Sequence, residues 1–370
     1  MIATNRRAFL RGTMAGASAL AIANAWPARA ATARREVRVG GKHIKTVDVH
    51  AHCVVDTSDL VKGTQYEKTV AGLVANKGQA SMVVKADRLD IMNQEGVDVQ
   101  ALTINPFWYD GTDKDFINKL MMEQNRQLAE IPKQFPGRFV SLATVSLQFP
   151  DLAAQQLEYA FKNYGMKGCG IGASVWPVME LSDPKLDPFW AKCQELNAFI
   201  FIHPQNSDVA TGITNRVKNF NGLLTNVIGN PLETTIGLSH VIFEGTLDKF
   251  PKLRLVAAHG GGFLVSYPDR SDHGCLMQPA SCKEPGFLKK KPTDYVHDLY
   301  VDSLVFGPEA LRHIIANTDI SHVMIGTDCP FPWTFNPVDH VLNTPVLSDA
   351  NKIAILGGNA CRLLDIPTAV

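Results

Sequence analysis

The stretch that decides the fold is TVDVHAHCVVD, residues 46–56, in which a short apolar run ends on His50 and His52. Side chains alternate along a β-strand, so residues two apart lie on the same face. We therefore expect both imidazoles to point to one side of a strand, with Asp48 one layer beneath them. A single histidine at a strand end is more often a structural residue than a ligand, so this pair needs partners elsewhere in the chain.

Seven further apolar runs follow the first, and most of the segments between them look helical. The runs are residues 46–50, 99–104, 139–145, 168–173, 199–204, 253–260, 299–303 and 322–328, and helix-like segments span 116–134, 152–164, 187–197 and 308–317. Continuous apolar strands separated by helices predict a parallel sheet covered on both faces. Eight strands, with no G-x-G-x-x-G after the first, favour an α/β fold of the (β/α)8 TIM barrel type over an open doubly wound sheet. We predict a single barrel domain over residues 46–370, with long loops at 53–84 and 266–292.

The first thirty residues differ from the rest of the chain. Arg6 and Arg7 precede a mildly apolar Ala/Gly stretch, which ends in the small residues of Ala28-Arg29-Ala30. This pattern predicts a twin-arginine (Tat) signal peptide over residues 1–30 and hence a periplasmic protein. A basic N-terminus ahead of an amphipathic helix is the alternative. Removal of the signal would take away four arginines and no acidic residue, which lowers the formal net charge from zero to −4.

The amino-acid composition indicates which class of partner the protein binds. The chain is 45% hydrophobic and 19% charged, and its formal net charge is zero. A balanced charge gives no indication of nucleic-acid binding, or of membrane binding once the signal is removed, so we expect a small-molecule substrate. The seven cysteines contain no C-x-x-C pair, which argues against a structural zinc site or a disulfide scaffold. Cys275 and Cys282 are close enough to bridge after export, but we expect buried free thiols.

Polar residues stand at the carboxyl ends of four of the eight runs. His50 and His52 end the first run, His203 the fifth, His259 the sixth and Asp328 the eighth. The carboxyl ends of barrel strands converge on one mouth, where the active sites of such barrels are built. Three imidazoles and one carboxylate that converge there would suit a divalent metal ion with nitrogen and oxygen ligands.

Four segments together resemble the amidohydrolase-related metal enzymes, in the branch typified by aminocarboxymuconate-semialdehyde decarboxylase. They are VDVHAH (47–52), FIHP (201–204), AHGGG (258–262) and IGTDCPF (325–331). The resemblance implies a deformed (β/α)8 barrel of the metal-dependent hydrolase type with one divalent ion, zinc or in some relatives manganese. The family's ligand positions match His50, His52, His203 and Asp328, and its catalytic histidine matches His259. Only one ion is expected, because no lysine ends the fourth run, and the resemblance favours a homodimer.

The resemblance makes a non-oxidative decarboxylase (a carboxy-lyase) of a small aromatic or unsaturated carboxylic acid the leading hypothesis. A metal-dependent hydrolase of an ester, lactone or amide could use the same ligands, and a non-catalytic metal-binding protein is a third hypothesis. His259 argues against the third, since an imidazole beside a metal ion is suited to proton transfer. In relatives that act on phenolic acids, the equivalent of Asp328 can deliver the proton.

The substrate pocket departs from that of the family's namesake. Gln205 stands where the namesake has a tryptophan, and Met277-Gln278-Pro279 replaces its Met-Arg-Pro segment. Without that arginine a dicarboxylate would lose a bidentate partner, which argues against the namesake's substrate. Arg270 matches an arginine of the family. The candidate pocket residues are Gln205, Trp108, Trp176, Phe331 and Arg270. The alternative for the aromatic members is that they pack the rim of the barrel.

Overall fold

Nine strand segments build the centre of the computed structural model, which describes residues 32–76, 78–175, 178–205, 222–283, 288–333 and 336–370. One parallel sheet has the order β3-β4-β5, and a second runs from β6 through β7, β8, β9 and β10 to β11. The bounds of these strands are β3 (Val47–Cys53), β4 (Val99–Ile104), β5 (Phe139–Ser141), β6 (Ala143–Thr144), β7 (Gly168–Gly172), β8 (Phe199–His203), β9 (Arg254–Ala257), β10 (Tyr300–Asp302) and β11 (Val323–Met324). An antiparallel pair, β1 (Arg38–Val39) and β2 (Lys42–His43), precedes them.

Backbone hydrogen bonds join the two sheets into a closed barrel. Leu142, between β5 and β6, donates its N–H to Leu102 O at 3.0 Å, so the two segments act as one strand. At the other junction Val49 donates to Ile325 O at 3.0 Å, and Ala51 forms a parallel bridge with Cys329. Eight strands therefore close the cylinder over the described part of the chain, and the predicted (β/α)8 barrel is confirmed.

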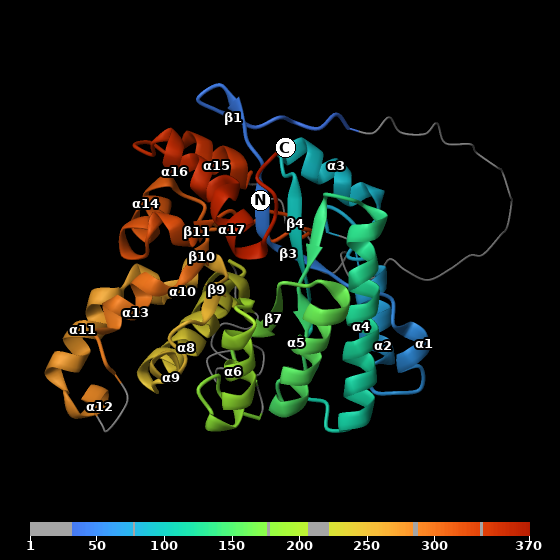
Figure 1. Ribbon diagram of the computed structural model, residues 1–370, viewed down its shortest axis with the longest axis horizontal. Coiled ribbons are helices and arrows are strands. Elements are labelled where there is room, and N and C mark those ends of the chain that lie inside the picture. Colours follow the sequence, from blue (N-terminus) through green and yellow to red (C-terminus); the bar gives the residue numbers. More distant parts are fainter. Residues whose placement is uncertain (1–31, 77, 176–177, 206–221, 284–287, 334–335) are drawn as a thin grey trace, which may run out of the picture. The chain divides into compact units, whose positions relative to one another are not determined.

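Helices surround the strands. Figure 1 shows α4, α5, α6 and α8 following one another around the barrel. The bounds of the longer helices are α3 (Ala86–Glu95), α4 (Lys114–Gln134), α5 (Pro150–Tyr164), α6 (Asp187–Glu195), α8 (Asn230–Phe243), α13 (Pro292–Asp298), α14 (Pro308–Asn317), α15 (Pro337–Asn343) and α17 (Asn359–Leu364). Local sequence sets their ends. Asp113 accepts the N–H groups of Asp115 and Phe116 at the start of α4, and α5 begins with a proline and ends at Gly165 in the left-handed conformation.

The two long loops predicted at the barrel mouth contain short helices. Residues 53–84 include α1 (Ser58–Val61) and α2 (Glu67–Ala75), and residues 266–292 include α11 (Pro268–Met277) and α12 (Ala280–Lys283). Contacts with the rest of the protein stabilise such short helices, and a single sequence does not show those contacts. For example, Tyr66 packs with Val70 and Trp108 in an apolar cluster beside α4.

A β-bulge in β3 changes the expected order of its side chains. Asp48 pairs with Gln100 and Ala51 pairs with Leu102, so Val49 and His50 together oppose a single residue of β4. The prediction that Asp48 lies in the layer beneath the histidines is therefore wrong. Asp48 instead accepts hydrogen bonds from Gln100 Nε2 at 2.9 Å and Thr327 Oγ1 at 2.7 Å. Gln100 in turn contacts Arg88 of α3, which places Asp48 on the helix side of the strand.

The cysteine prediction is confirmed in part. Cys53, Cys169, Cys193, Cys329 and Cys361 are buried free thiols. Cys275 and Cys282 form a disulfide between α11 and α12, so the expectation of free thiols at these two positions is wrong. The helical hairpin that brings them together lies in the segment that the sequence analysis assigned to a loop. Among the described helices, none is both long enough and apolar enough to cross a membrane.

Close packing between α8 and β7 gives a test of the fold. A Cβ added at Gly237 of α8 would lie 2.1 Å from the carbonyl oxygen of Ala173, whereas a Cβ added at Gly72 of α2 meets nothing within 4 Å. We predict that Gly237→Ala lowers the free energy of unfolding by about 1–3 kcal/mol, because the helix must move away from the strand. Gly72→Ala is the matched control, and it should raise stability by up to about 1 kcal/mol through helix propensity. Urea unfolding midpoints measure both changes, and equal effects of the two substitutions would contradict this packing.

Candidate metal centre

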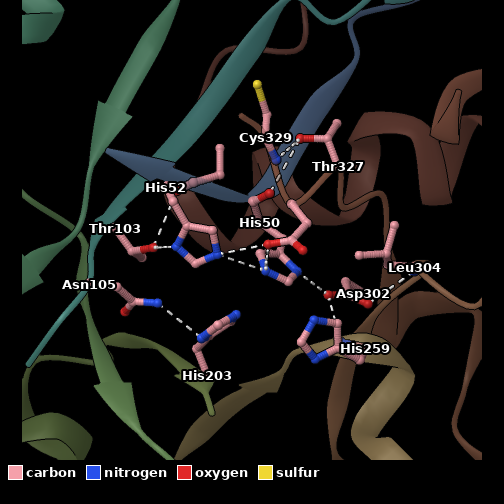
Figure 2. A network of polar contacts seen from close by, with 12 residues as sticks. His50, His52, Thr103, Asn105, His203, His259, Asp302, Leu304, Thr327 and Cys329 are labelled. Carbon is pink, nitrogen blue, oxygen red and sulfur yellow. Dashed lines mark hydrogen bonds and ion pairs between the residues drawn. The ribbon is translucent and has the colours of Figure 1, made fainter. Parts of the chain in front are cut away.

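The carboxyl ends of the strands bring the predicted residues together at one mouth of the barrel. His50 and His52 lie on β3, and His203 ends β8. His259 lies two residues beyond β9, and Asp328 lies four residues beyond β11. Figure 2 shows the four imidazoles arranged around a common centre. One ligand atom from each of His50, His203, His259 and Asp328 lies within 4.8 Å of the others, a spacing that suits a single ion.

His52 joins this cluster through short contacts with two of its members. His52 Nε2 lies 3.1 Å from His50 Nε2 and 3.0 Å from Asp328 Oδ1, and the third side of this triangle is 3.2 Å. A divalent ion binds nitrogen and oxygen at about 2.0–2.2 Å, and the centre of such a triangle lies only about 1.8 Å from each corner. An ion placed just outside its plane can therefore touch all three atoms.

The other ring nitrogen of each histidine holds the imidazole in a suitable orientation. His50 Nδ1 lies 2.6 Å from Asp302 Oδ2, and His203 Nδ1 lies 2.7 Å from the carbonyl oxygen of Pro204. His52 Nδ1 lies 3.3 Å from Thr103 Oγ1. With Nδ1–H donating to these oxygens, each Nε2 keeps its lone pair for an ion. The donor set of three nitrogens and one carboxylate oxygen thus fits a divalent metal such as zinc or manganese.

Burial and neighbouring charges set the protonation of the groups at the centre. Burial alone would lower the pKa of His50, but Asp328 and Asp302 outweigh it and raise the pKa to about 10. Burial would also raise the pKa of Asp328, yet the neighbouring His50 and His52 hold it well below its usual range. By contrast, burial lowers the pKa of His52 and moves that of His203 well below its usual value. Without an ion, His50 is therefore cationic, with a proton on each ring nitrogen, and Asp328 is negatively charged.

His259 differs from the other histidines in its backbone and in its partners. Its residue has a positive φ of 56°, which is unusual for a side chain with a Cβ, and its N–H donates to Asp302 Oδ2 at 2.9 Å. Its Nδ1 is buried and has no hydrogen-bond partner among the described residues. Burial and the adjacent His50 lower the pKa of His259 to about 4, so the imidazole is neutral at physiological pH. A neutral ring with a free polar atom is available to a bound substrate.

The sequence analysis missed several residues that support the centre. Asp302, at the end of the seventh run, is fully buried against His50, and its position at a strand end was the signal that could have identified it. Trp333 donates Nε1–H to Asp328 Oδ2 at 2.8 Å. Arg88 is also fully buried and donates Nη2–H to the carbonyl oxygen of His52 at 2.8 Å. No sequence pattern indicates these last two contacts, because they depend on the packing of a loop and of α3.

The predicted pocket residues lie in different surroundings and do not form one pocket. The Phe331 ring is 37% exposed, and its centroid lies 5.6 Å from that of His52. Gln205 is held at the barrel rim, where it donates Nε2–H to Ser174 O at 2.5 Å and its backbone N–H to Glu233 Oε1 at 2.9 Å. Trp108 is buried on Tyr66 in the cluster beside α4, the packing role considered as the alternative. Arg270 is exposed on α11. Trp176 lies outside the described residues.

A closed α/β barrel with a histidine and aspartate metal site at the carboxyl ends of its strands defines a class, the metal-dependent barrel enzymes. Residues 47–366 match the family model described as amidohydrolase, so the chain belongs to the amidohydrolase family and is an enzyme of that superfamily. This assignment confirms the family that the four sequence segments resemble.

Three similar proteins illustrate the family. The chain is 29% identical over 282 residues to 2-amino-3-carboxymuconate-6-semialdehyde decarboxylase of Dictyostelium discoideum, which covers 75% of this chain and 76% of that protein. It is 26% identical over 291 residues to gamma-resorcylate decarboxylase of Polaromonas sp. strain JS666, with 75% and 86% covered. Its fold matches the crystal structure of a dihydroxybenzoic acid decarboxylase from Polaromonas sp. JS666 with bound manganese and 2-nitroresorcinol. There the TM-score is 0.73 at 23% identity, over 88% of this chain and 98% of the other.

The raised pKa of His50 makes metal binding dependent on pH. Below a pKa of about 10 the ion must displace a proton from His50, so the apparent dissociation constant should weaken about tenfold for each unit that the pH falls from 9 to 7. Isothermal titration with Zn²⁺ or Mn²⁺ in two buffers of different ionisation enthalpy should give about one proton released per ion at neutral pH. Binding that is independent of pH, with no proton release, would contradict this electrostatic description.

Proposed function

We propose that the protein is a metal-dependent non-oxidative decarboxylase of a small aromatic or unsaturated carboxylic acid. The observation that carries the proposal is the cluster of His50, His203, His259 and Asp328, in which His259 is neutral and its buried Nδ1 has no hydrogen-bond partner among the described residues. The similar proteins described above support it, since each of them is a decarboxylase. A bound divalent ion would supply a Lewis acid that attracts the anionic oxygens of the substrate.

The reaction consumes one proton, which the chain must deliver to carbon. The bond between the ring or chain carbon and the carboxylate breaks, its electron pair stays on that carbon, and CO2 leaves as a proton is added. A neutral imidazole can accept a proton on one nitrogen and release the proton of the other. His259 therefore relays the proton, whereas the lowered pKa of Asp328 means that this residue carries no proton at neutral pH. Asp328 would instead hold the ion, and its Oδ2 accepts the Trp333 Nε1–H at 2.8 Å.

Aromatic side chains beside the centre favour a flat substrate. Phe331 lies edge-on to His52, and Phe306 packs on Trp333 with ring centroids 5.0 Å apart. Phe306 is 47% exposed. Such rings bind planar conjugated acids through offset or edge contacts. For the metal, three imidazole nitrogens with one carboxylate suit zinc, and manganese is the alternative because a decarboxylase of the same fold binds it.

Product analysis tests this function. We expect the metal-loaded protein to release CO2 from at least one hydroxybenzoate or unsaturated acid, and a chelator to abolish that release. His259→Gln should lower kcat by about 10²–10⁴-fold, because the proton relay is lost. His297→Gln, a substitution at an exposed position on α13, is the matched control and should leave the rate unchanged. If the protein instead cleaves esters, lactones or amides and forms an acid without CO2, it is a hydrolase and the proposal is wrong.

We also propose that the twin-arginine signal exports the protein to the periplasm. The disulfide between Cys275 and Cys282 supports this localisation, because disulfides persist in oxidising compartments. In a bacterial host with the twin-arginine system, replacement of both Arg6 and Arg7 by lysine should keep the protein in the cytoplasm. Cell fractionation and immunoblotting measure the distribution. Equal export of the original and the substituted chain would exclude this route.

A further inference from the structure

We propose that Asp302 is a positioning residue that holds His50 and His259 in one arrangement through a single carboxylate. Asp302 Oδ2 lies 2.6 Å from His50 Nδ1 and also accepts the backbone N–H of His259 at 2.9 Å. The same oxygen therefore binds a histidine of the metal site and the backbone of the proposed proton relay. Figure 2 shows Asp302 between these two residues. The inference does not depend on which acid the enzyme cleaves.

The second oxygen of Asp302 fixes the loops on either side. Oδ1 accepts the N–H of Gly260 at 2.9 Å and the N–H of Leu304 at 3.0 Å. Each oxygen thus accepts two hydrogen bonds, and the side chain is fully buried. A carboxylate has about four acceptor positions, so none is left for an ion or a substrate. Asp302 consequently acts through its neighbours and not by direct contact with the reacting atoms.

The backbone around His259 shows why this support is needed. His259 and Gly260 have φ values of 56° and 63°, and a positive φ at a residue with a Cβ persists only where the surroundings impose it. The two successive N–H groups both donate to Asp302, which fixes the turn that aims the His259 side chain. In the same way, a carboxylate on Nδ1 of a metal-binding histidine sets the ring orientation and strengthens Nε2 as a ligand.

The segment that follows β11 packs closely against both partners. A Cβ added at Gly326 would lie 2.8 Å from the Cβ of Asp302 and 2.9 Å from the Cβ of His50. Only a glycine lets the backbone approach the pair this closely. The backbone of residue 326 therefore limits movement of Asp302 and His50 on this side.

Asp302→Asn tests the proposal, with Asp98→Asn as the matched control. Asp98 is also a buried carboxylate that accepts a backbone N–H, from Thr46 at 2.9 Å, but it precedes β4 at the opposite end of the barrel. We expect Asp302→Asn to weaken Zn²⁺ affinity about 10–100-fold and to change the visible spectrum of the Co²⁺-loaded protein. Asp98→Asn should leave both unchanged while lowering the thermal midpoint. Chelator competition gives the affinity.

The outcomes separate positioning from general destabilisation. Unchanged Zn²⁺ affinity and an unchanged Co²⁺ spectrum in Asp302→Asn would overturn the proposal, and so would an equal loss of affinity in both variants. If Asp302→Asn does not fold, the wild-type protein still provides a test. In ¹⁵N-histidine-labelled protein with Zn²⁺, the His50 Nδ1–H should give a far-downfield signal protected from exchange, because it is buried against Asp302. Absence of such a signal would also overturn the proposal.

Discussion

The metal site depends on the hydrogen bonds that close the barrel. Asp328 donates its backbone N–H to His50 O at 2.8 Å, and His52 donates to Cys329 O at 2.7 Å. These bonds join β3 to the segment that follows β11, next to the side chains of His50, His52 and Asp328. Two residues that are far apart along the chain are thereby held at a distance set by strand pairing and not by flexible side chains. A loss of closure would separate Asp328 from both histidines at once.

The sequence predicted the strands well because each is a short apolar run, and four of the eight runs end in the polar residues that form the centre. His50, His52, His203, His259 and Asp328 come together as expected from this rule. The same rule applies to Asp302, which ends β10, although the sequence analysis did not name it. Other features were beyond a single sequence. The bulge that turns Asp48 toward the helices depends on the register between two strands, and the contact of Trp333 with Asp328 depends on how a loop returns to the mouth.

A second group of buried charged residues lies on the helix-facing side of β3, behind the histidines of the centre. Arg88 is fully buried and binds His52 O, while Asp48 accepts hydrogen bonds from the backbone N–H groups of His50 and Thr327. Burial raises the pKa of Asp48 to about 6. A buried cation needs hydrogen-bond acceptors, and Arg88 finds them in Gln100 Oε1 at 3.3 Å and the carbonyl oxygen of His52. Arg88 and Asp48 thus hold the backbone of β3 on its helix-facing side. Asp302 and Thr103 contact the imidazoles of His50 and His52 on the side of the metal centre.

The bulge in β3 has a consequence for how such a protein can evolve. Val49 and His50 share one position of the neighbouring strand, so the chain carries one more residue there than regular pairing requires. Point substitutions near the mouth can alter what is bound while the strand keeps its register. Loss of the Val49 codon would restore regular pairing, because Asp48, His50 and Ala51 would then oppose Gln100, Ala101 and Leu102 in turn. Both imidazoles would stay on the inner face of the barrel. Insertion of one residue between His50 and His52 would instead turn His52 toward the helices, so the spacing of the two histidines constrains this segment more than the bulge does.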